Sequence, residues 1–296
     1  MTAKDLPSVG VVGAGIMGTA IATRLLERGL PVYVYDLDAA KVAGLAAKGA
    51  IVATSAADST AAADFVILSL NSAAIVRAAV FGANGVAEAA SPGKLLIDMS
   101  SIDPKATVEL AEKLRAETGM GWVDAPLSGG APAAAKGTLT VMAGGSAENV
   151  TRAREVMDHL CANYTHMGPS GAGQTTKLIN QLLCAFAFQA VAEAVKLAEA
   201  GGVDATRIPA ALAGGRADGR ILQEFMPKFA RRDYTPTGRI DNMLKDLEAV
   251  QAFAAVGRTP LPVTGLITEL HRLMVAAGIG GEDTAAMMMQ FDGFKR

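Results

Sequence analysis

Short apolar runs alternate with longer segments of helical periodicity over the first half of the chain. We expect the apolar runs to be buried strands: Val9–Val12, Val32–Tyr35, Phe65–Leu70, Leu95–Ile97 and Leu139–Ala143. The alanine-rich segments between them repeat their apolar residues at the spacing of a helix. Strands that alternate with helices in this way are typical of a parallel sheet wound with helices.

The pattern changes after Tyr164, where a glycine-rich break over residues 166–173 follows. Residues 174–200 then form one long helical pattern without glycine or proline, and Gly201-Gly202 marks its end. Further helices are expected over 204–213, 219–231, 240–256, 262–277 and 284–291. The prediction is an α/β fold: a doubly wound sheet over residues 1–170, then an all-α domain over residues 171–296, joined by the long helix.

Composition limits the partners that the chain is expected to have. Its 296 residues, 51% of them apolar, are enough for more than one core. A net charge of -2 provides no basic field, so neither nucleic acid nor an anionic membrane is an expected partner. The first residues lack the apolar run of a signal peptide, and the longest apolar stretch, Leu182–Ala192, is shorter than a membrane span. We expect a cytoplasmic protein.

Metal binding is not expected either. The two cysteines, Cys161 and Cys184, lack the spacing of metal ligands, and the histidines at His159, His166 and His271 are scattered. We expect reduced and mostly buried thiols.

The first expected strand runs into a Gly-x-Gly-x-x-Gly motif, made of Gly13, Ala14, Gly15, Ile16, Met17 and Gly18. Between a strand and a helix, these glycines provide a tight turn, a close approach of the backbone to pyrophosphate, and close helix–strand packing. A helix from about Ile16 offers free N–H groups to the phosphates. The motif predicts a Rossmann-type dinucleotide site; a purely structural turn is the alternative.

Asp36 closes the next expected strand, about 20 residues further on, where such sites carry an acid. Its carboxylate would accept hydrogen bonds from the adenosine ribose and repel a 2′-phosphate. Leu37 follows it, rather than an arginine. We therefore favour NAD as the cofactor without excluding NADP, and Lys41 is the residue most able to reverse this preference.

Separated segments of the chain together resemble the β-hydroxyacid dehydrogenase family, which includes 3-hydroxyisobutyrate dehydrogenase and tartronate semialdehyde reductase. They are Gly13–Gly18, Asp98–Ser101, Asp124–Gly130, Gly171–Asn180 and Lys245-Asp246, in the family's order over nearly the whole chain. The resemblance implies a Rossmann domain, a C-terminal domain for substrate binding and dimerisation, and a homodimer or homotetramer. It also implies an NAD(P)-dependent enzyme that interconverts a small β-hydroxyacid and its carbonyl form.

Lys177 and Asn180 are the expected catalytic residues. Carbonyl reduction needs a proton for the developing alkoxide, and a lysine in a closed, partly apolar site can have its pKa lowered towards neutrality. Asn180 lies three residues on, hence on the same helix face. By resemblance, Lys177 is the general acid/base and Asn180 its partner. A solvated surface charge is the alternative for the lysine.

Ser128, Gly129 and Gly130 follow a short expected strand, Trp122–Asp124. The glycines allow bare backbone N–H groups to approach an anion, and the serine adds a hydroxyl group. The resemblance implies that this segment binds the carboxylate of a small anionic substrate. An ordinary turn is the alternative.

Further cofactor contacts are expected where strands end, because ligands of open α/β sheets gather at the carboxyl ends. Leu70 and Asn71 follow one strand, and Ser101 follows another. Asn71 departs from the family pattern, in which many members have proline there, so its contact would come from the backbone. The resemblance implies that Lys245 reaches the cofactor and substrate from the helical domain.

Two arginines, Arg216 and Arg220, stand where relatives often carry small or apolar residues. Guanidinium groups suit carboxylates, phosphates and phosphonates. We hypothesise that Arg220, together with Arg216, binds a second acidic group of the substrate. Solvated arginines at a helix end are the alternative.

Other interpretations stay open. Imine reductases share the architecture but often replace the lysine at the position of Lys177, and 6-phosphogluconate dehydrogenases have a larger helical domain. A non-catalytic dinucleotide-sensing protein would keep the glycine motif without the proton-transfer residues. The long apolar helix is compatible with a subunit interface and equally with a buried intramolecular helix.

Overall fold

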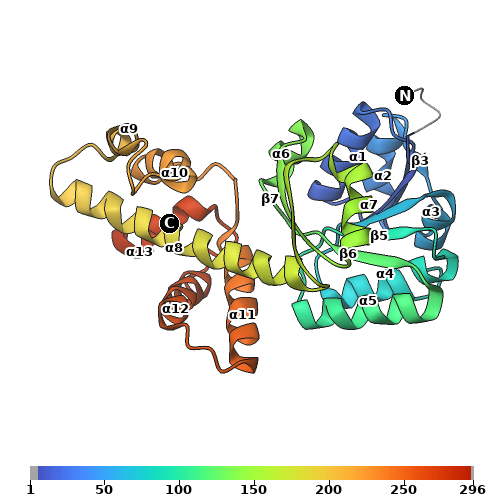
Figure 1. Ribbon diagram of the computed structural model, residues 1–296. Coiled ribbons are helices and arrows are strands. Elements are labelled where there is room, and N and C mark those ends of the chain that lie inside the picture. Colours follow the sequence, from blue (N-terminus) through green and yellow to red (C-terminus); the bar gives the residue numbers. More distant parts are fainter. Residues whose placement is uncertain (1–5, 295–296) are drawn as a thin grey trace. The chain divides into compact units, whose positions relative to one another are not determined.

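The computed structural model describes residues 6–294. Over this range the chain forms two compact units, divided between Lys177 and Leu178. The first unit holds a nine-stranded sheet with helices on both faces, and the second is helical (Figure 1). The expected fold class is confirmed. The division falls inside the long helix α8 (Ala172–Ala200).

Parallel strands make up most of the sheet: β1 (Val9–Val12), β2 (Val32–Tyr35), β3 (Ile51–Val52), β4 (Phe65–Leu68), β5 (Leu95–Asp98) and β6 (Gly121–Asp124). Their order is β3-β2-β1-β4-β5-β6. The winding reverses between β1 and β4, which is where open α/β sheets bind their ligands. The strands end together at Val12, Leu68, Asp98 and Asp124, an edge that we call the carboxyl edge.

Further described strands extend the sheet beyond β6. Strand β8 (Leu139–Gly144) is antiparallel to β6 and β7 (Leu127–Ser128), and parallel to β9 (Cys161–Gly168). The glycine-rich break expected over residues 166–173 is shorter than predicted: residues 166–168 are the end of β9 and α8 begins at Ala172, which leaves a turn at residues 169–171. This edge strand is largely exposed and buries only Tyr164, so it has no apolar run to mark it.

Two other expectations about strands need correction. Strand β4 ends at Leu68 rather than Leu70, because the chain turns at the carboxyl edge. The short strands β3 and β7 are not among the expected ones, since two residues each are too few to show a period.

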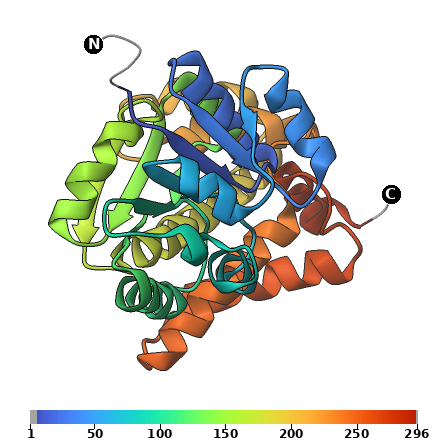
Figure 2. The ribbon, with the colours of Figure 1, turned by 90° about the vertical axis from the view of Figure 1, so that its right-hand side faces the viewer.

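Helices cover both faces of this sheet (Figures 1 and 2). One layer consists of α1 (Ile16–Glu27), α2 (Ala39–Ala46), α6 (Gly130–Lys136) and α7 (Ala147–Met157), and the other of α3 (Ala56–Ala62), α4 (Ala73–Phe81), α5 (Pro104–Thr118) and the 3₁₀ turn Val86–Ala89. In β4, Phe65 and Ile67 are buried under the first layer, and Val66 and Leu68 under the second. A strand buried on both faces is a continuous apolar run, which makes it predictable.

Polar side chains mark where several of these helices begin. Each accepts a hydrogen bond from the backbone N–H three residues later: Ser55 before α3, Ser72 before α4, Asp103 before α5 and Ser146 before α7. Helix α1 differs, because its N-cap residue is Gly15, which has no side chain to cap it. Its first N–H groups are therefore not occupied by a capping side chain.

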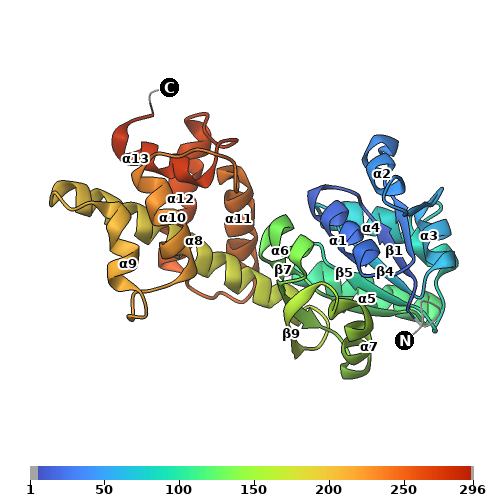
Figure 3. The same ribbon diagram turned by 90° about the horizontal axis from the view of Figure 1, so that it is seen from above.

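The second unit is built around α8, a continuous helix of 29 residues (Figure 3). The helices described after it are α9 (Ile208–Leu212), α10 (Arg220–Ala230), α11 (Ile240–Val256), α12 (Pro262–Ala276) and α13 (Met289–Asp292), with 3₁₀ turns at Ala205–Arg207 and Thr284–Met288. Phe188 of α8 packs edge-to-face on Phe225 of α10, with ring centroids 4.8 Å apart. The helix expected over 284–291 is instead a 3₁₀ turn, Thr284–Met288, followed by the short helix α13.

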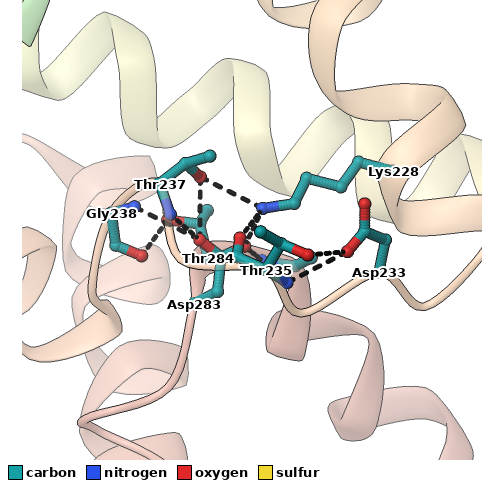
Figure 4. Close-up of polar contacts among 8 residues, drawn as sticks. Lys228, Asp233, Thr235, Thr237, Gly238, Asp283 and Thr284 are labelled. Carbon is teal, nitrogen blue, oxygen red and sulfur yellow. Dashed lines mark hydrogen bonds and ion pairs between the residues drawn. The ribbon is translucent and has the colours of Figure 1, made fainter.

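A buried ion pair ties the connection between α10 and α11 to the chain before α13 (Figure 4). Lys228 donates to Asp283 at 2.6 Å, and Thr237 donates to the same carboxylate through its N–H and its hydroxyl. Although burial opposes it, these hydrogen bonds and one from Ala285 hold the pKa of Asp283 below its usual value. Each buried polar group in this cluster therefore has a partner.

By length and apolar composition alone, α8 is the one helix within residues 6–294 that could cross a membrane. That observation is weak, because the core helix of a soluble protein has the same properties.

Candidate active site

The glycine motif at the end of β1 is built as a dinucleotide site requires. A Cβ atom on Gly13, whose φ is 99°, would lie 2.5 Å from the carbonyl oxygen of Ser69, and one on Gly18 would lie 1.8 Å from that of Gly13. These positions accept only glycine. Above Gly15, by contrast, no atom lies within 4 Å of an added Cβ. The backbone there is open to a ligand, as the close approach of a pyrophosphate demands.

The first turn of α1 continues this open surface. Ile16 is exposed and Met17 is half-buried, while Ala14 is buried and directs its N–H to Asp36 Oδ2 at 2.7 Å. Since no side chain caps α1, its N-terminal N–H groups and dipole are available to an anion. These features suit the diphosphate of a nicotinamide dinucleotide.

Asp36 is held at the end of β2 beside the glycine motif. Its second oxygen, Oδ1, accepts from the N–H of Asp38 at 2.9 Å and lies 3.6 Å from Lys41 Nζ. Leu37 is 92% exposed and adds no charge. The carboxylate is therefore oriented by the protein itself, with Lys41 close enough to offset part of its charge.

The loops after β4 and β5 are tied to each other at the carboxyl edge. The N–H of Leu70 donates to Ser100 Oγ at 3.0 Å, and the N–H of Ser100 donates to Asp98 Oδ1 at 3.0 Å. Asn71 is exposed and Ser101 is half-buried. The candidate cofactor contacts in these loops thus belong to one hydrogen-bonded assembly.

Ser128, Gly129 and Gly130 lie where β7 passes into α6. Ser128 is held by pairing with Thr140 of β8. Gly129 and Gly130 are exposed, with φ of 121° and 66°, a backbone conformation that favours glycine. Neither glycine has a side chain of its own to cover its N–H group, so the pair suits a carboxylate.

The start of α8 is anchored on the carboxyl edge by a buried aspartate. Asp124 accepts from the N–H of Gly171 at 2.9 Å and from that of Gln174 at 3.1 Å. A Cβ on Gly173 would lie 2.4 Å from the carbonyl oxygen of Met142, so the helix packs there backbone to backbone. Lys177 is half-buried and follows Gly173 and Gln174 by one turn, on the helix face that packs on this edge.

Sequence reasoning assigns no role to the carboxyl groups of Asp98 and Asp124, which are direct neighbours in the sheet. Both are fully buried. Burial raises the pKa of Asp98 to about 7, and repulsion from Asp124 adds to that effect. Burial also raises the pKa of Asp124. The available signal was an acid at the end of each of two apolar strands.

Asn180 and Lys245 belong to the second unit and are linked by residues that sequence reasoning left without a role. Asn180 donates to Gln181 Oε1 at 2.8 Å, and the amide of Gln181 donates to Asp246. Lys245 Nζ lies 3.4 Å from the other oxygen of Asp246. Helices α8 and α11 thus share a polar network that contains both candidates.

Arg220 begins α10 and is ion-paired within its own helix. Its Nε lies 2.8 Å from Glu224 Oε1, and its side chain is 78% exposed. Arg216 is also exposed. Among residues 6–294, no group of three or more His, Cys, Asp or Glu side chains is arranged to hold a metal ion.

Both units match protein families. Residues 8–168 match the family described as the NAD binding domain of 6-phosphogluconate dehydrogenase. Residues 171–291 match the family described as NAD-binding of NADP-dependent 3-hydroxyisobutyrate dehydrogenase.

Individual proteins are similar to this chain along its length. It is 34% identical over 289 residues to L-threonate dehydrogenase of Cupriavidus necator, covering 97% of each protein. It is 34% identical to 2-hydroxy-3-oxopropionate reductase of Escherichia coli, covering 96% of this chain and 97% of that one. A solved 3-hydroxyisobutyrate dehydrogenase from Salmonella typhimurium is 34% identical, with a TM-score of 0.84 over 97% of this chain and 100% of that one.

Proposed function

The chain belongs to the β-hydroxyacid dehydrogenase family, and from this premise we propose that it interconverts a small β-hydroxyacid and its carbonyl form, with Lys177 as general acid/base. It is an NAD(P)-dependent oxidoreductase that acts on a CH–OH group. The observation that carries the proposal is the anchoring of α8 by Asp124, because Lys177 follows one turn later on the same face.

In the proposed reaction, different residues bind the cofactor, bind the substrate and transfer the proton. The nicotinamide, when bound, supplies or accepts the hydride. Gly13–Gly18 would hold the diphosphate on the N-terminus of α1, and the N–H groups of the exposed Gly129 and Gly130, with the hydroxyl of Ser128, would hold the substrate carboxylate. In reduction, Lys177 Nζ gives its proton to the alkoxide oxygen; in oxidation it takes that proton back.

Asn180 and Lys245 complete the proposed site. Asn180 orients the reacting oxygen beside the ammonium group, and Lys245 contacts the cofactor and substrate. The network through Gln181 and Asp246 supports both roles, since it limits the rotamers of each side chain. NAD is the preferred cofactor because Asp36 is already oriented beside Ala14. Leu70, Asn71 and Ser101 contribute the remaining cofactor contacts.

The decisive experiment measures NADH and NADPH oxidation with a panel of semialdehydes, and with imines as a separate arm. In the Lys177→Ala variant we expect kcat to fall by about 10²- to 10⁴-fold while cofactor binding is retained. Lys113→Ala, on the surface of α5, is the control. A Lys177→Ala variant as active as this control would rule out the role of Lys177, and turnover of imines alone would replace the proposed substrate class.

A second acidic group on the substrate is the finer proposal. Arg220 is exposed and therefore accessible to a ligand, but its guanidinium group would have to exchange Glu224 for the substrate. We expect Arg220→Ala to lower kcat/KM for dianionic substrates by about tenfold or more, and to leave kcat/KM for monoanionic substrates unchanged. An unchanged preference would exclude this role, and also that of Arg216 as its partner.

The remaining proposals concern assembly and location. We propose a cytoplasmic homodimer or homotetramer with α8 at the subunit interface. Ile179, Leu183 and Leu197 support this, because they are apolar and exposed along α8. Light scattering would measure the mass, and a monomer at micromolar concentration would contradict the proposal.

A further inference from the structure

The side chain of Gln174 is bound to the loop that carries a candidate cofactor contact. It is 1% exposed, and its Nε2 donates to the carbonyl oxygen of Ser100 at 2.8 Å. Its Oε1 accepts from the N–H of Ile102 at 3.2 Å. The two bonded groups flank Ser101 on either side, so the carboxamide pairs with this stretch of backbone much as a neighbouring strand would.

The other cofactor loop is attached to the same point. The hydroxyl oxygen of Ser100 accepts from the N–H of Leu70, and the N–H of Ser100 donates to Asp98, each at 3.0 Å. A displacement of Ser100 would therefore shift the backbone beside both Asn71 and Ser101. The Gln174 carboxamide restrains this displacement.

The backbone of Gln174 is fixed as firmly as its side chain. Its N–H donates to Asp124 Oδ2 at 3.1 Å, within the first turn of α8. Lys177 follows three residues later, a rise of about 4.5 Å along the helix. Because a helix is stiff over one turn, a shift in the backbone of Gln174 would shift Lys177 and its ammonium group as well.

We infer that Gln174 is a positioning residue that sets the distance between the cofactor loop at Ser101 and the ammonium group of Lys177. The inference rests on the proposed function, since it concerns the geometry of the same hydride and proton transfer. A displacement of about 1 Å in such a geometry can cost on the order of 10² in rate. Gln174 touches neither ligand in this scheme, so its loss should reduce turnover much more than binding.

The test compares two buried glutamines of one helix. Gln174→Met keeps the length of the side chain and removes both hydrogen bonds to the loop. Gln189→Met is the matched control: Gln189 is 6% exposed, bonds to Glu193 and Gln290, and lies about 22 Å further along α8. Each variant is measured for kcat, for the dissociation constant of NADH, for melting temperature, and for the isotope effect with deuterated NADH.

We expect Gln174→Met to lower kcat by about 30- to 100-fold, with a change in the NADH dissociation constant below about threefold. The primary isotope effect should increase, because hydride transfer then limits turnover. Gln189→Met should keep the wild-type kcat and isotope effect, even if its melting temperature falls as much. If the role of Gln174 were purely structural, the two variants would not differ in kcat or in the isotope effect.

A second variant keeps the inference testable if Gln174→Met does not fold. The carboxyl group of Gln174→Glu, buried against the carbonyl oxygen of Ser100, can donate and accept like the amide only while it is protonated. The ratio of its kcat to that of the wild type should therefore rise as the pH falls.

Failure of the inference about Gln174 and failure of the proposed function give different results. If the wild type is active, three results would overturn the inference alone. They are an unchanged kcat and isotope effect in Gln174→Met, an equal loss of kcat in both methionine variants, and a kcat ratio of Gln174→Glu to wild type that does not change with pH. A wild type that turns over no β-hydroxyacid or semialdehyde with either nucleotide overturns both.

Discussion

Asp98 ends β5 with its carboxyl group fully buried, and its Oδ2 atom has no hydrogen-bond partner among the described residues. Burial raises its pKa from the usual 3.8 to about 7, with a smaller contribution from Asp124. The folded state therefore favours the neutral acid. The stabilisation from this preference is complete below a pH of about 4 and is lost as the pH rises through about 7.

The Asp98→Asn variant tests this pH dependence. Asparagine is neutral at every pH, so the free energy of unfolding of the wild type should fall relative to the variant between pH 5 and pH 8. Urea unfolding at both pH values measures the difference. Asp64→Asn is the control, because hydrogen bonds from Ser8 lower the pKa of Asp64 and keep it ionised throughout this range. Parallel profiles for wild type and Asp98→Asn would contradict the assignment.

At the same scale, we propose that the carboxylate of Asp36 determines the choice between NAD and NADP. Asp36→Asn should weaken NADH binding by about tenfold to a hundredfold, because charge-assisted hydrogen bonds to the ribose are lost, and should strengthen NADPH binding. Titration of each nucleotide measures both constants. Asp38→Asn removes a neighbouring charge but keeps the cap of α2, so it should leave the preference intact. Equal shifts in the two variants would show that net charge, rather than the Asp36 carboxylate, is responsible.

At the scale of elements, a strand can be predicted from sequence where burial alone determines it. Strand β4 is apolar on both faces and was therefore visible, whereas β9 lies at the sheet edge with polar residues and was not. The glycine motif was equally predictable, since close contacts at Gly13 and Gly18 allow no other residue.

Other parts of the candidate site depend on contacts between elements. The proximity of Asp98 and Asp124 follows from the register of β5 on β6. The bonds of Gln174 follow from the placement of α8 on the loop after β5. No local pattern carries this information, because the partners are far apart in the sequence.

Close packing of α8 on the sheet has a measurable consequence. In Gly173→Ala, the new methyl group would meet the carbonyl oxygens of Met142 and Asp124 at 2.4 and 2.6 Å, so we expect a loss of about 1–3 kcal/mol in unfolding free energy. Gly44→Ala in α2 meets no atom within 4 Å and should instead stabilise the protein by up to about 1 kcal/mol. Chemical denaturation measures both, and effects of the same sign would contradict this account.

At the scale of the whole molecule, the two units have separate hydrophobic cores. A substitution that destabilises one core should therefore leave the stability of the other unit unchanged. The ion pair of Lys228 and Asp283 provides the test, because it joins distant parts of the second unit and the Asp283 side chain is fully buried.

Asp283→Ala leaves Lys228 without its buried partner and should cost about 3–5 kcal/mol. Hydrogen exchange should show faster exchange of amides in α10 and α11 while β1 and β4 keep their protection. Asp233→Ala, at an exposed carboxylate of the same connection, should change little. Equal loss of protection in the sheet would mean that the two cores do not unfold independently.

The anchoring of α8 also bears on the order in which the protein folds. Its first turn is held by Asp124, a residue 47 positions away from Gly171, rather than by a neighbouring cap. Long-range contacts of this kind form late, after the chain between them has been organised. The turn that carries Lys177, the proposed proton donor, should thus form only once β6 has joined the sheet, as one of the last steps of folding.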